Sequence, residues 1–250
     1  MNAGISLAIA IRVVRQLRRD PRTIILLLVI PALLEALMYW VFDANEAVFQ
    51  RIGVPLLGIF PLVMMFLVSS ITMLRERSSG TLERLMTLPV SRLDLLAGYA
   101  IAFTAVAALQ VLVASAVSFW LLGLESHGSV AAIIALAMLN AVLGVALGLF
   151  VSAFARTEFQ AVQFMPIFIM PQIIVCGLFT PRGAMAPALD WLSNIFPMSY
   201  SYEALSLVAA GNSGELTLFR DILVVIAFAV VALAAGAATL PRRTPYPAVM

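Results

Sequence analysis

The sequence predicts an all-α polytopic membrane protein with six transmembrane helices, on three observations. First, 63% of its 250 residues are hydrophobic and only 11% are charged, which leaves too little polar surface for a water-soluble domain. Second, the apolar residues form several runs of about 19 or more, each long enough to cross a hydrocarbon core of roughly 30 Å. Third, these runs are continuously apolar instead of alternating, which excludes a transmembrane β-barrel.

Interruptions in the apolar runs set the boundaries of the spans. Polar segments rich in Gly, Pro or charged residues separate the runs, and Asp43–Arg51 is predicted to be one such loop, with a net acidic charge. We expect a single transmembrane domain over 1–250. Its predicted spans are 23–42, 54–74, 95–122, 130–154, 161–179 and 222–240.

Glu35 is a carboxylate inside the first predicted span. A charge within a membrane is costly, so such a residue is a functional candidate by default. The alternative is that Glu35 lies near the outer end of the span, where it is hydrated or hydrogen-bonded to Tyr39 one turn on. Both interpretations stay open at this point.

Small and polar residues recur every four positions in the fourth predicted span, at Asn140, Gly144, Gly148 and Ser152. A stripe of small residues lets two helix backbones approach closely in a membrane. We therefore expect this stripe to be a helix-packing surface and not a binding site.

Pro166 and Pro171 interrupt the fifth predicted span, which also carries Gln163 and Gln172. A proline-broken helix with amides at membrane depth is expected to face protein or a cavity, because lipid cannot satisfy its polar groups. The segment 180–214 follows, with apolar pieces too short to span. We expect it to form surface or re-entrant helices.

Five arginines lie in one arc of a helical wheel drawn over the N-terminal segment, 1–22, with apolar residues opposite. This pattern predicts an amphipathic interfacial helix whose basic face meets anionic headgroups. The same arginines either only set the topology or also touch a partner. They are Arg12, Arg15, Arg18, Arg19 and Arg22.

The arginines predict the orientation of the chain. With six spans, twelve arginines lie on the side of the N-terminus and three, Arg51, Arg182 and Arg220, lie on the other. The positive-inside rule then places both termini in the cytoplasm. The absence of Lys beside abundant Ala, Val and Arg is typical of a GC-rich bacterial genome, so we expect a multi-pass protein of the bacterial cell membrane.

The stretch Arg75–Arg92 is the longest charged interruption between two apolar spans. Within it, Leu82, Leu85 and Met86 recur at helical spacing, and Gly80 and Pro89 bound them. This predicts a short amphipathic helix at the cytoplasmic membrane surface, within the segment 75–94, that serves as a docking element.

All fifteen basic residues are Arg, and this excludes several chemistries. Without Lys the chain has neither a standard P-loop nor a Schiff base, so we expect no ATP site of its own and no enzymatic activity. His127 and Cys176 are the only His and the only Cys. We therefore expect no catalytic triad, no metal site, no bound cofactor and no disulfide.

Two groups of residues carry a resemblance to a known family. Arg75-Glu76-Arg77, Gly80-Thr81-Leu82-Glu83, Leu85 and Pro89-Val90-Ser91-Arg92 resemble the signature of ABC-2 type transport permeases, the membrane subunits of type V ABC exporters of the daunorubicin-exporter type. The chain departs from that signature by one extra residue, since Ser78-Ser79 precede Gly80. Gly177-Leu178-Phe179-Thr180-Pro181, Phe196-Pro197 and Tyr202-Glu203-Ala204-Leu205 are similar to the family's region after the fifth span.

The resemblance implies that Arg75–Arg92 is a coupling helix, seated in a cleft of a separate ABC ATP-binding subunit that carries ATP and Mg. Two such subunits and a second permease chain, as homodimer or heterodimer, complete the transporter; membrane lipid surrounds it, and no nucleic acid takes part. Charged residues of the segment then contact the ATPase and apolar ones fill its cleft. The implied docking residues are Glu76, Gly80, Thr81, Leu82, Glu83, Arg84, Leu85, Met86, Pro89 and Arg92.

The resemblance also implies an ATP-driven exporter that works by alternating access, with the second and fifth spans along its pathway. The rings and thioethers of these spans suit a hydrophobic drug or natural product. A lipid or cell-wall glycan precursor is the alternative cargo, and a non-transporting assembly or sensor subunit is the alternative of another class. The expected pathway residues are Phe60, Met64, Phe66, Ser69, Phe164, Phe168 and Gln172.

Overall fold

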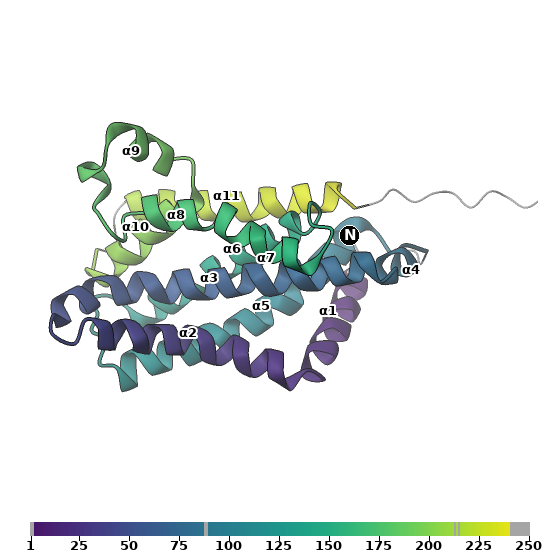
Figure 1. Cartoon of the computed structure of the whole chain (residues 1–250), viewed down its shortest axis with the longest axis horizontal. Helices are drawn as coiled ribbons and strands as arrows, with labels where there is room; N and C mark the ends of the chain where they lie inside the picture. Colours follow the sequence, from purple (N-terminus) through teal and green to yellow (C-terminus); the bar gives the residue numbers. More distant parts are fainter. Residues whose placement is uncertain (1–2, 88–89, 213, 215, 241–250) are drawn as a thin grey trace, which may run out of the picture.

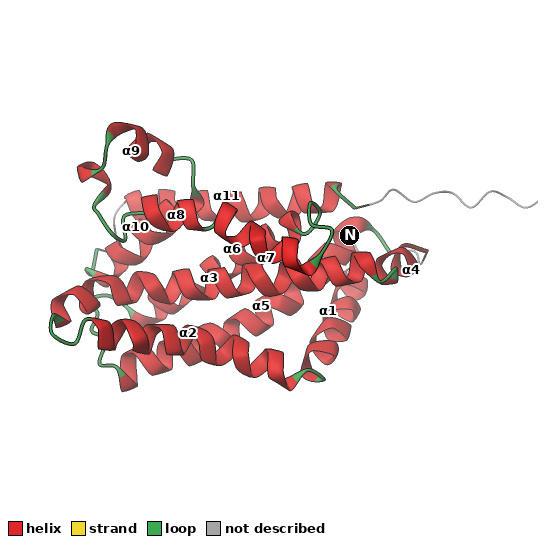
Figure 2. Ribbon diagram, in the orientation of Figure 1, coloured by secondary structure: helices red, strands yellow, loops and turns green. Residues whose placement is uncertain are grey.

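The computed structural model describes residues 3–87, 90–212, 214 and 216–240, and this part of the chain is all-helical (Figures 1 and 2). Six of its helices are long and apolar enough to cross a membrane, as predicted. They lie side by side along the long axis of the bundle. Pro89 and the tail with Arg242 and Arg243 lie outside the described residues.

The observed spans follow the predicted ones with shifted ends. Five of them are single helices, except that a π-helical turn, Val117–Leu121, extends α5. The fifth span is divided in two. The helices are α2 (Pro21–Val41), α3 (Glu46–Ser78), α5 (Arg92–Ala116), α6 (Val130–Val151), the pair α7 (Glu158–Phe168) and α8 (Met170–Val175), and α11 (Leu216–Ala238).

The predicted loop Asp43–Arg51 is wrong in its second half, because α3 already begins at Glu46. Asn45 stands at the N-cap, and a carboxylate in the first turn interacts favourably with the helix dipole. Pro55 and Pro61 lie inside α3 without ending it. With 33 residues, α3 is roughly 50 Å long, so it extends beyond a hydrocarbon core of about 30 Å.

The core of the bundle lies where α3 packs against α6. Gly144 and Gly148 of α6 face α3 so closely that an added Cβ would overlap the backbone carbonyls of Leu62 and Phe66. Buried Ser69 of α3 donates a hydrogen bond across this contact to the carbonyl of Val145, at 3.3 Å. The predicted packing role of the small-residue stripe is therefore confirmed.

The fifth span breaks at Ile169, between α7 and α8, as its prolines predicted. The short helices α9 (Pro187–Ser193) and α10 (Pro197–Ala209) follow it, and neither is long enough to span. They lie at the end of the bundle opposite to the short helix α4 (Figure 1). We refer to these two ends as the α10 end and the α4 end.

The amphipathic helix α1 (Ala3–Arg18) lies at the α4 end (Figure 1). Its apolar face packs against α5 of the same chain, with Ile9, Ala10 and Val13 buried. Gly98 of α5 permits this, because a Cβ there would come within 2.6 Å of the Ile9 side chain. The helix is therefore part of the bundle, and Arg15 and Arg18 of its basic arc are exposed.

Candidate functional site

A tight turn joins α3 to α4 (Thr81–Thr87). Ser78 is the last residue of α3 and Ser79 is its C-cap, so the extra residue of the sequence signature lies in this helix end. Gly80 follows with φ of +72°, a left-handed conformation that favours glycine. The turn sets α4 directly at the end of the longest helix.

Glu76 lies in the last turns of α3 and does not belong to the exposed surface. Its side chain is 4% exposed, and both its oxygens accept hydrogen bonds from Nη2 of Arg12, at 2.9 and 3.1 Å. Burial lowers the pKa of Arg12, whereas Tyr99 and Glu76 raise it, and the net direction is upward. The predicted contact of Glu76 with an ATPase is thus replaced by an internal ion pair with a charged guanidinium.

The two neighbours of Glu76 make contacts in other directions. Arg75 donates two hydrogen bonds to Glu158 in the first turn of α7, at 2.6 and 2.9 Å. Arg77 donates one to the hydroxyl of Thr239, just after α11, at 3.2 Å. Consecutive side chains on a helix point about 100° apart, so three adjacent residues reach three different elements. We call Arg75, Glu76 and Arg77 the α3 junction.

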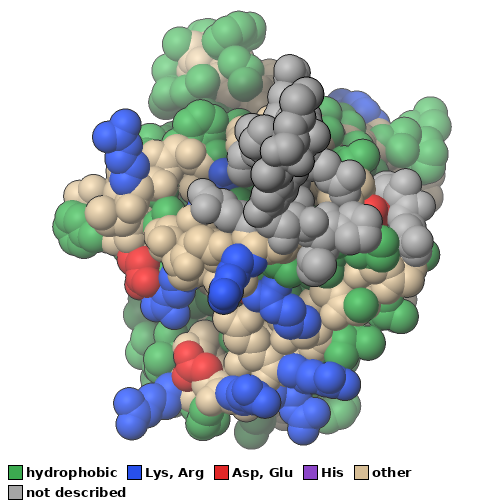
Figure 3. Space-filling model, turned by 90° about the vertical axis from the view of Figure 1, so that its right-hand side faces the viewer, with side chains coloured by type: hydrophobic (Ala, Val, Ile, Leu, Met, Phe, Trp, Pro, Cys, Tyr) green, Lys and Arg blue, Asp and Glu red, His purple; other side chains and the backbone are tan. Residues whose placement is uncertain are grey.

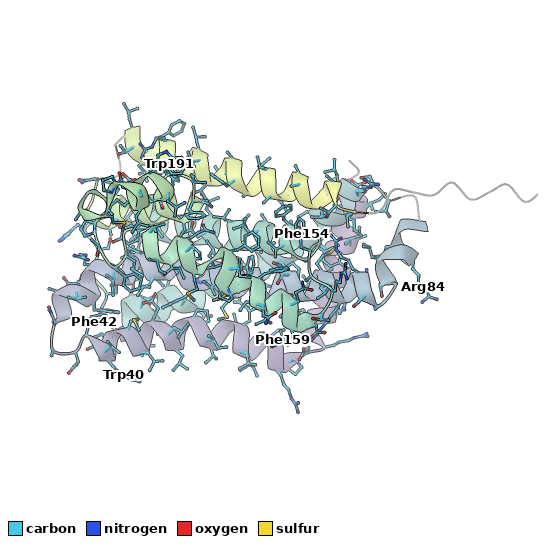
Figure 4. The ribbon with its side chains drawn as sticks, turned by 45° about the horizontal axis from the view of Figure 1, so that its top comes forward. Trp40, Phe42, Arg84, Phe154, Phe159 and Trp191 are labelled. Atoms are coloured by element: carbon cyan, nitrogen blue, oxygen red, sulfur yellow. The ribbon has the colours of Figure 1, made fainter. Side chains whose placement is uncertain are left out.

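The predicted docking residues of α4 divide between the core and the surface. Leu82 is 3% exposed within the hydrophobic core formed with α1 and α5, and Leu85 packs against that core. The prediction that they fill a partner's cleft is therefore wrong for Leu82. Arg84 is exposed and points away from the bundle (Figure 4). The side chains of Glu83 and Met86 lie outside the described residues.

The remaining predicted docking residues flank α4. Thr81 is half-buried, and its hydroxyl lies 2.9 Å from that of Ser79. Arg92 is half-buried at the start of α5. A capping box fixes this start, because the Ser91 hydroxyl accepts from the amide of Asp94 and the Asp94 carboxylate accepts from the amide of Ser91. Both ends of α4 thus adjoin well-defined helix ends.

The α4 end carries a predominantly basic surface (Figure 3). Two of its acidic groups, Glu76 and Glu158, are bound to arginines of the same chain. A surface of this kind attracts an acidic protein surface or anionic headgroups. The exposed arginines at this end are Arg15, Arg18, Arg19, Arg22, Arg75, Arg84 and Arg156.

The predicted pathway residues do not form one site. Phe60 and Phe66 of α3 and Phe164 of α7 belong to one hydrophobic cluster, which also contains residues of α6 and α11, and Phe66 is fully buried in it. Ser69 is buried against α6, and the amide of Gln172 donates to the carbonyl of Phe168 at the break between α7 and α8, at 2.7 Å. The second span and the first half of the fifth are in contact within this chain, through α3 and α7.

Two predicted pathway residues remain at the edge of this cluster. Met64 is half-buried on α3, and the ring of Phe168 is 40% exposed. Phe168 makes an edge contact with Phe164, at 6.0 Å between ring centroids. Most of the predicted set therefore has an internal packing or hydrogen-bonding role in the single chain.

Glu35 is 1% exposed, and neither of its oxygens has a hydrogen-bond partner among the described residues. The alternative, in which Glu35 is hydrated or hydrogen-bonded to Tyr39, is therefore contradicted. Tyr39 instead makes an edge contact with the ring of Phe49, at 5.3 Å.

A family model described as ABC-2 type transporter matches residues 6–209, from within α1 to the last residue of α10. The chain belongs to the ABC-2 type transporter family. The matched region contains the α3 junction and α4, which are the residues that carried the resemblance in the sequence.

Curated relatives of this ABC-2 permease match parts of it. The linearmycin resistance permease protein LnrN of Bacillus subtilis (strain 168) is 27% identical over 165 residues, 66% of this chain and 43% of that protein. The probable multidrug ABC transporter permease YbhS of Escherichia coli (strain K12) is 28% identical over 195 residues, 77% and 51% of the two chains. The chain thus spans about half the length of these relatives or less.

Sequence reasoning missed the internal partners of the α3 junction. Glu158 and Thr239 lie 83 and 162 positions away from the arginines that bind them. Arg12 was assigned to the basic arc of α1, but it turns inward. A helical wheel places Arg12 on that arc, and only the packing of α1 against α5 shows which arginine meets the buried carboxylate at the end of α3.

Proposed function

We propose that this ABC-2 permease is the membrane subunit of an ATP-driven exporter and that α4 is its coupling helix. The observation that carries the proposal is the α3 junction, which binds the base of α4 to α1, α7 and the end of α11 at once. A displacement of α4 would therefore be transmitted to three other elements. A short surface helix without such attachment would move independently of the spans.

The partner is a separate ABC ATP-binding subunit that docks at the α4 end. Exposed Arg84 and the basic face of α1 supply the contacts, while Leu82 holds α4 to its own bundle. Two ATP-binding subunits close on ATP and Mg, and two permease chains pair so that alternating access results. The concentration of arginine at the α4 end supports a cytoplasmic location for this end and for both termini.

The cargo that we propose is a hydrophobic drug or natural product. The names of the relatives, which speak of linearmycin resistance and multidrug transport, support this choice. Phe60 and Phe66 of α3 and Phe164 of α7 belong to one hydrophobic cluster, so the two spans that we propose to line the pathway share apolar surface. A lipid or cell-wall precursor remains the second candidate, since the same apolar surfaces suit an acyl chain.

Co-purification tests the proposal. The tagged permease is co-expressed with a candidate ABC ATP-binding protein from the same organism, extracted in mild detergent and assayed for bound ATPase activity. We expect retention by the wild type and a strong loss in Arg84→Glu. The matched control is Arg156→Glu, an exposed arginine at the same end but outside α4. Absence of an ATP-binding subunit from the wild-type preparation, or equal retention by both variants, contradicts the proposal.

Transport in proteoliposomes tests the cargo. With the complex reconstituted, we expect apolar drugs to stimulate ATP hydrolysis. Stimulation by acyl lipids alone would replace the drug by the lipid as cargo. If neither drugs nor acyl lipids change the rate of ATP hydrolysis, an assembly or sensor role is favoured.

A further inference from the structure

The turn from α1 into α2 carries three exposed arginines, Arg18, Arg19 and Arg22. None of them forms an ion pair among the described residues, whereas Arg12 is paired inside the bundle. Figure 1 shows this turn at the lower edge of the α4 end, and Figure 3 shows basic side chains along that edge. We call residues 18–22 the α1–α2 elbow, and its charge is available to a partner.

Asp20 is the single carboxylate of the elbow. Its oxygens accept hydrogen bonds from the hydroxyl and the backbone amide of Thr23, at 2.6 and 3.3 Å, which makes Asp20 the N-cap of α2. These hydrogen bonds lower the pKa of Asp20, that from the hydroxyl most, so the carboxylate keeps its negative charge. The neighbouring ion pair of Arg75 and Glu158 adds no net charge. Three guanidinium groups against one carboxylate therefore leave the elbow positive.

Arg22 begins a stripe of exposed side chains along the outer face of α2. Leu26, Val29 and Leu33 follow it at i+4, i+7 and i+11, the spacing of one helix face, and each is about half exposed. The same face continues to Trp40, which is 61% exposed near the other end of the helix. An exposed apolar face that runs the length of a span suits the hydrocarbon of a bilayer. We call Leu26, Val29 and Leu33 the α2 stripe, and Arg22 lies at its end.

The exposed face of α1 has the same division. Leu7 and Ile11 are exposed apolar residues in its first half. Arg15 and Arg18 follow Leu7 at i+8 and i+11, on the same face and also exposed. Positive charge thus adjoins exposed apolar surface on both helices that meet at the elbow. This combination is typical of a segment at the boundary between hydrocarbon and headgroups.

A partner of the elbow must offer a negative charge and an apolar body together. An ATP-binding subunit is a water-soluble protein that can contact Arg84 on α4, but it does not enter the hydrocarbon along the α2 stripe. An anionic phospholipid offers both, since its acyl chains lie in the hydrocarbon and its phosphate lies at the depth of the elbow. A guanidinium matches a phosphate in a two-bond geometry. The position of the elbow at the start of a span therefore favours a lipid over a protein.

We propose that the α1–α2 elbow binds an anionic phospholipid of the leaflet at the α4 end, with its phosphate on Arg18, Arg19 and Arg22 and an acyl chain along the α2 stripe. This goes beyond the proposed export function, since the binding requires neither ATP nor cargo. The lipid anchors the joint between the first span and α1, which is itself tied to the end of α3 by an ion pair.

Photolabelling tests the site. The permease, alone and in complex with its ATP-binding subunit, is placed in phosphatidylcholine nanodiscs that contain phosphatidylglycerol with a diazirine on its acyl chain. The labelled peptides are located by mass spectrometry, and phosphatidylcholine with the same diazirine chain is the neutral comparison. We expect phosphatidylglycerol to label 23–33 about tenfold or more above phosphatidylcholine in both preparations, since each basic residue near an anionic headgroup contributes about a fivefold preference.

Arginine variants separate the charge from the fold. The triple variant with Arg18→Gln, Arg19→Gln and Arg22→Gln should lose most of the preference for phosphatidylglycerol, and three lysines at these positions should retain more of it. Arg22→Gln alone should lower the preference about fivefold, and it replaces the triple variant if that does not fold. The matched control is Arg156→Gln, which removes an exposed arginine of the same end from outside the elbow and should leave the labelling of 23–33 unchanged.

Three outcomes overturn the proposal. They are equal labelling of 23–33 by the two lipids, unchanged labelling in the folded elbow variants, and loss of the label when the ATP-binding subunit binds, which would assign the elbow to the protein interface. The docking of α4 is judged separately. Absence of the preference in a complex that retains its ATP-binding subunit contradicts only the lipid site, whereas preferential labelling of a permease that retains none contradicts only the docking.

Discussion

Arg12 of α1 binds Glu76 of α3 through both carboxylate oxygens, across 64 positions of sequence. The pair joins the amphipathic N-terminal helix to the helix end that carries α4. Glu76 is buried and Arg12 is about one-third exposed, so the pair is shielded from water mainly on its acidic side. Removing the arginine therefore leaves a buried carboxylate without its partner.

Arg12→Ala should lower the free energy of unfolding by about 1–3 kcal/mol, the cost of leaving a buried polar group unsatisfied. Thermal unfolding of the detergent-purified permease measures the change. Glu76→Ala in the Arg12→Ala background should add much less than it does alone, because the contact is already lost. Additive losses would mean that the two residues act independently. Arg15→Ala, an exposed change on the same helix, should stay within about 0.5 kcal/mol of the wild type.

Gly144→Ala should destabilise the bundle at the contact of α3 and α6. The added Cβ would overlap the carbonyl of Leu62, which is backbone and cannot rotate away. Overpacking of this kind costs about 1–3 kcal/mol or more. The measurement is the thermal midpoint together with the monodisperse yield in size-exclusion chromatography. Gly183→Ala is the matched control, since no atom lies within 4 Å of its Cβ position. Equal behaviour of the two variants would contradict the close packing.

Gly80→Ala should strain the α3–α4 turn by about 1–2 kcal/mol, because φ at this position is +72°. No atom surrounds the site, so the effect arises from the backbone and not from a clash. If α4 is the coupling helix, cargo-stimulated ATP hydrolysis should fall in this variant. ATP hydrolysis should fall less in Gly80→Asn, since Asn tolerates the left-handed region better than Ala. A larger defect in Gly80→Asn than in Gly80→Ala would exclude this backbone explanation.

Arg182→Lys should loosen α9 without removing the positive charge. A lysine offers one ammonium group and cannot reach Ser193, Asn194 and Glu203 together. Loss of about 1.4 kcal/mol of local stability corresponds to a tenfold faster amide exchange by local opening. Hydrogen exchange of 187–196 measures it, with Arg156→Lys at the α4 end as control. Unchanged amide exchange would show that the contacts of Arg182 do not hold α9 in place.

The membrane character, the number of spans and the α4 helix followed from the sequence alone. A span is recognisable because a run of about 20 apolar residues is rare outside a membrane. The break at Ile169 is recognisable because nearby prolines interrupt a helix. Leu82 and Leu85 likewise predicted a helix with an apolar face. Each of these features depends on residues that follow one another within a single helix, which is what a sequence pattern reports.

Only the tertiary structure decided what those faces meet. Leu82 belongs to the chain's own core, Glu76 to Arg12, and Arg182 to α9 and α10, because helices distant in sequence lie side by side. The cavity at the α10 end has the same origin, since residues from α3, the α5–α6 connection, α9 and α10 line it together. The sequence by itself determined that this is a six-span membrane protein with a short helix between its second and third spans. Helix packing decided which charged residues are paired inside the bundle and which remain exposed, because burial and pairing are properties of the assembled helices.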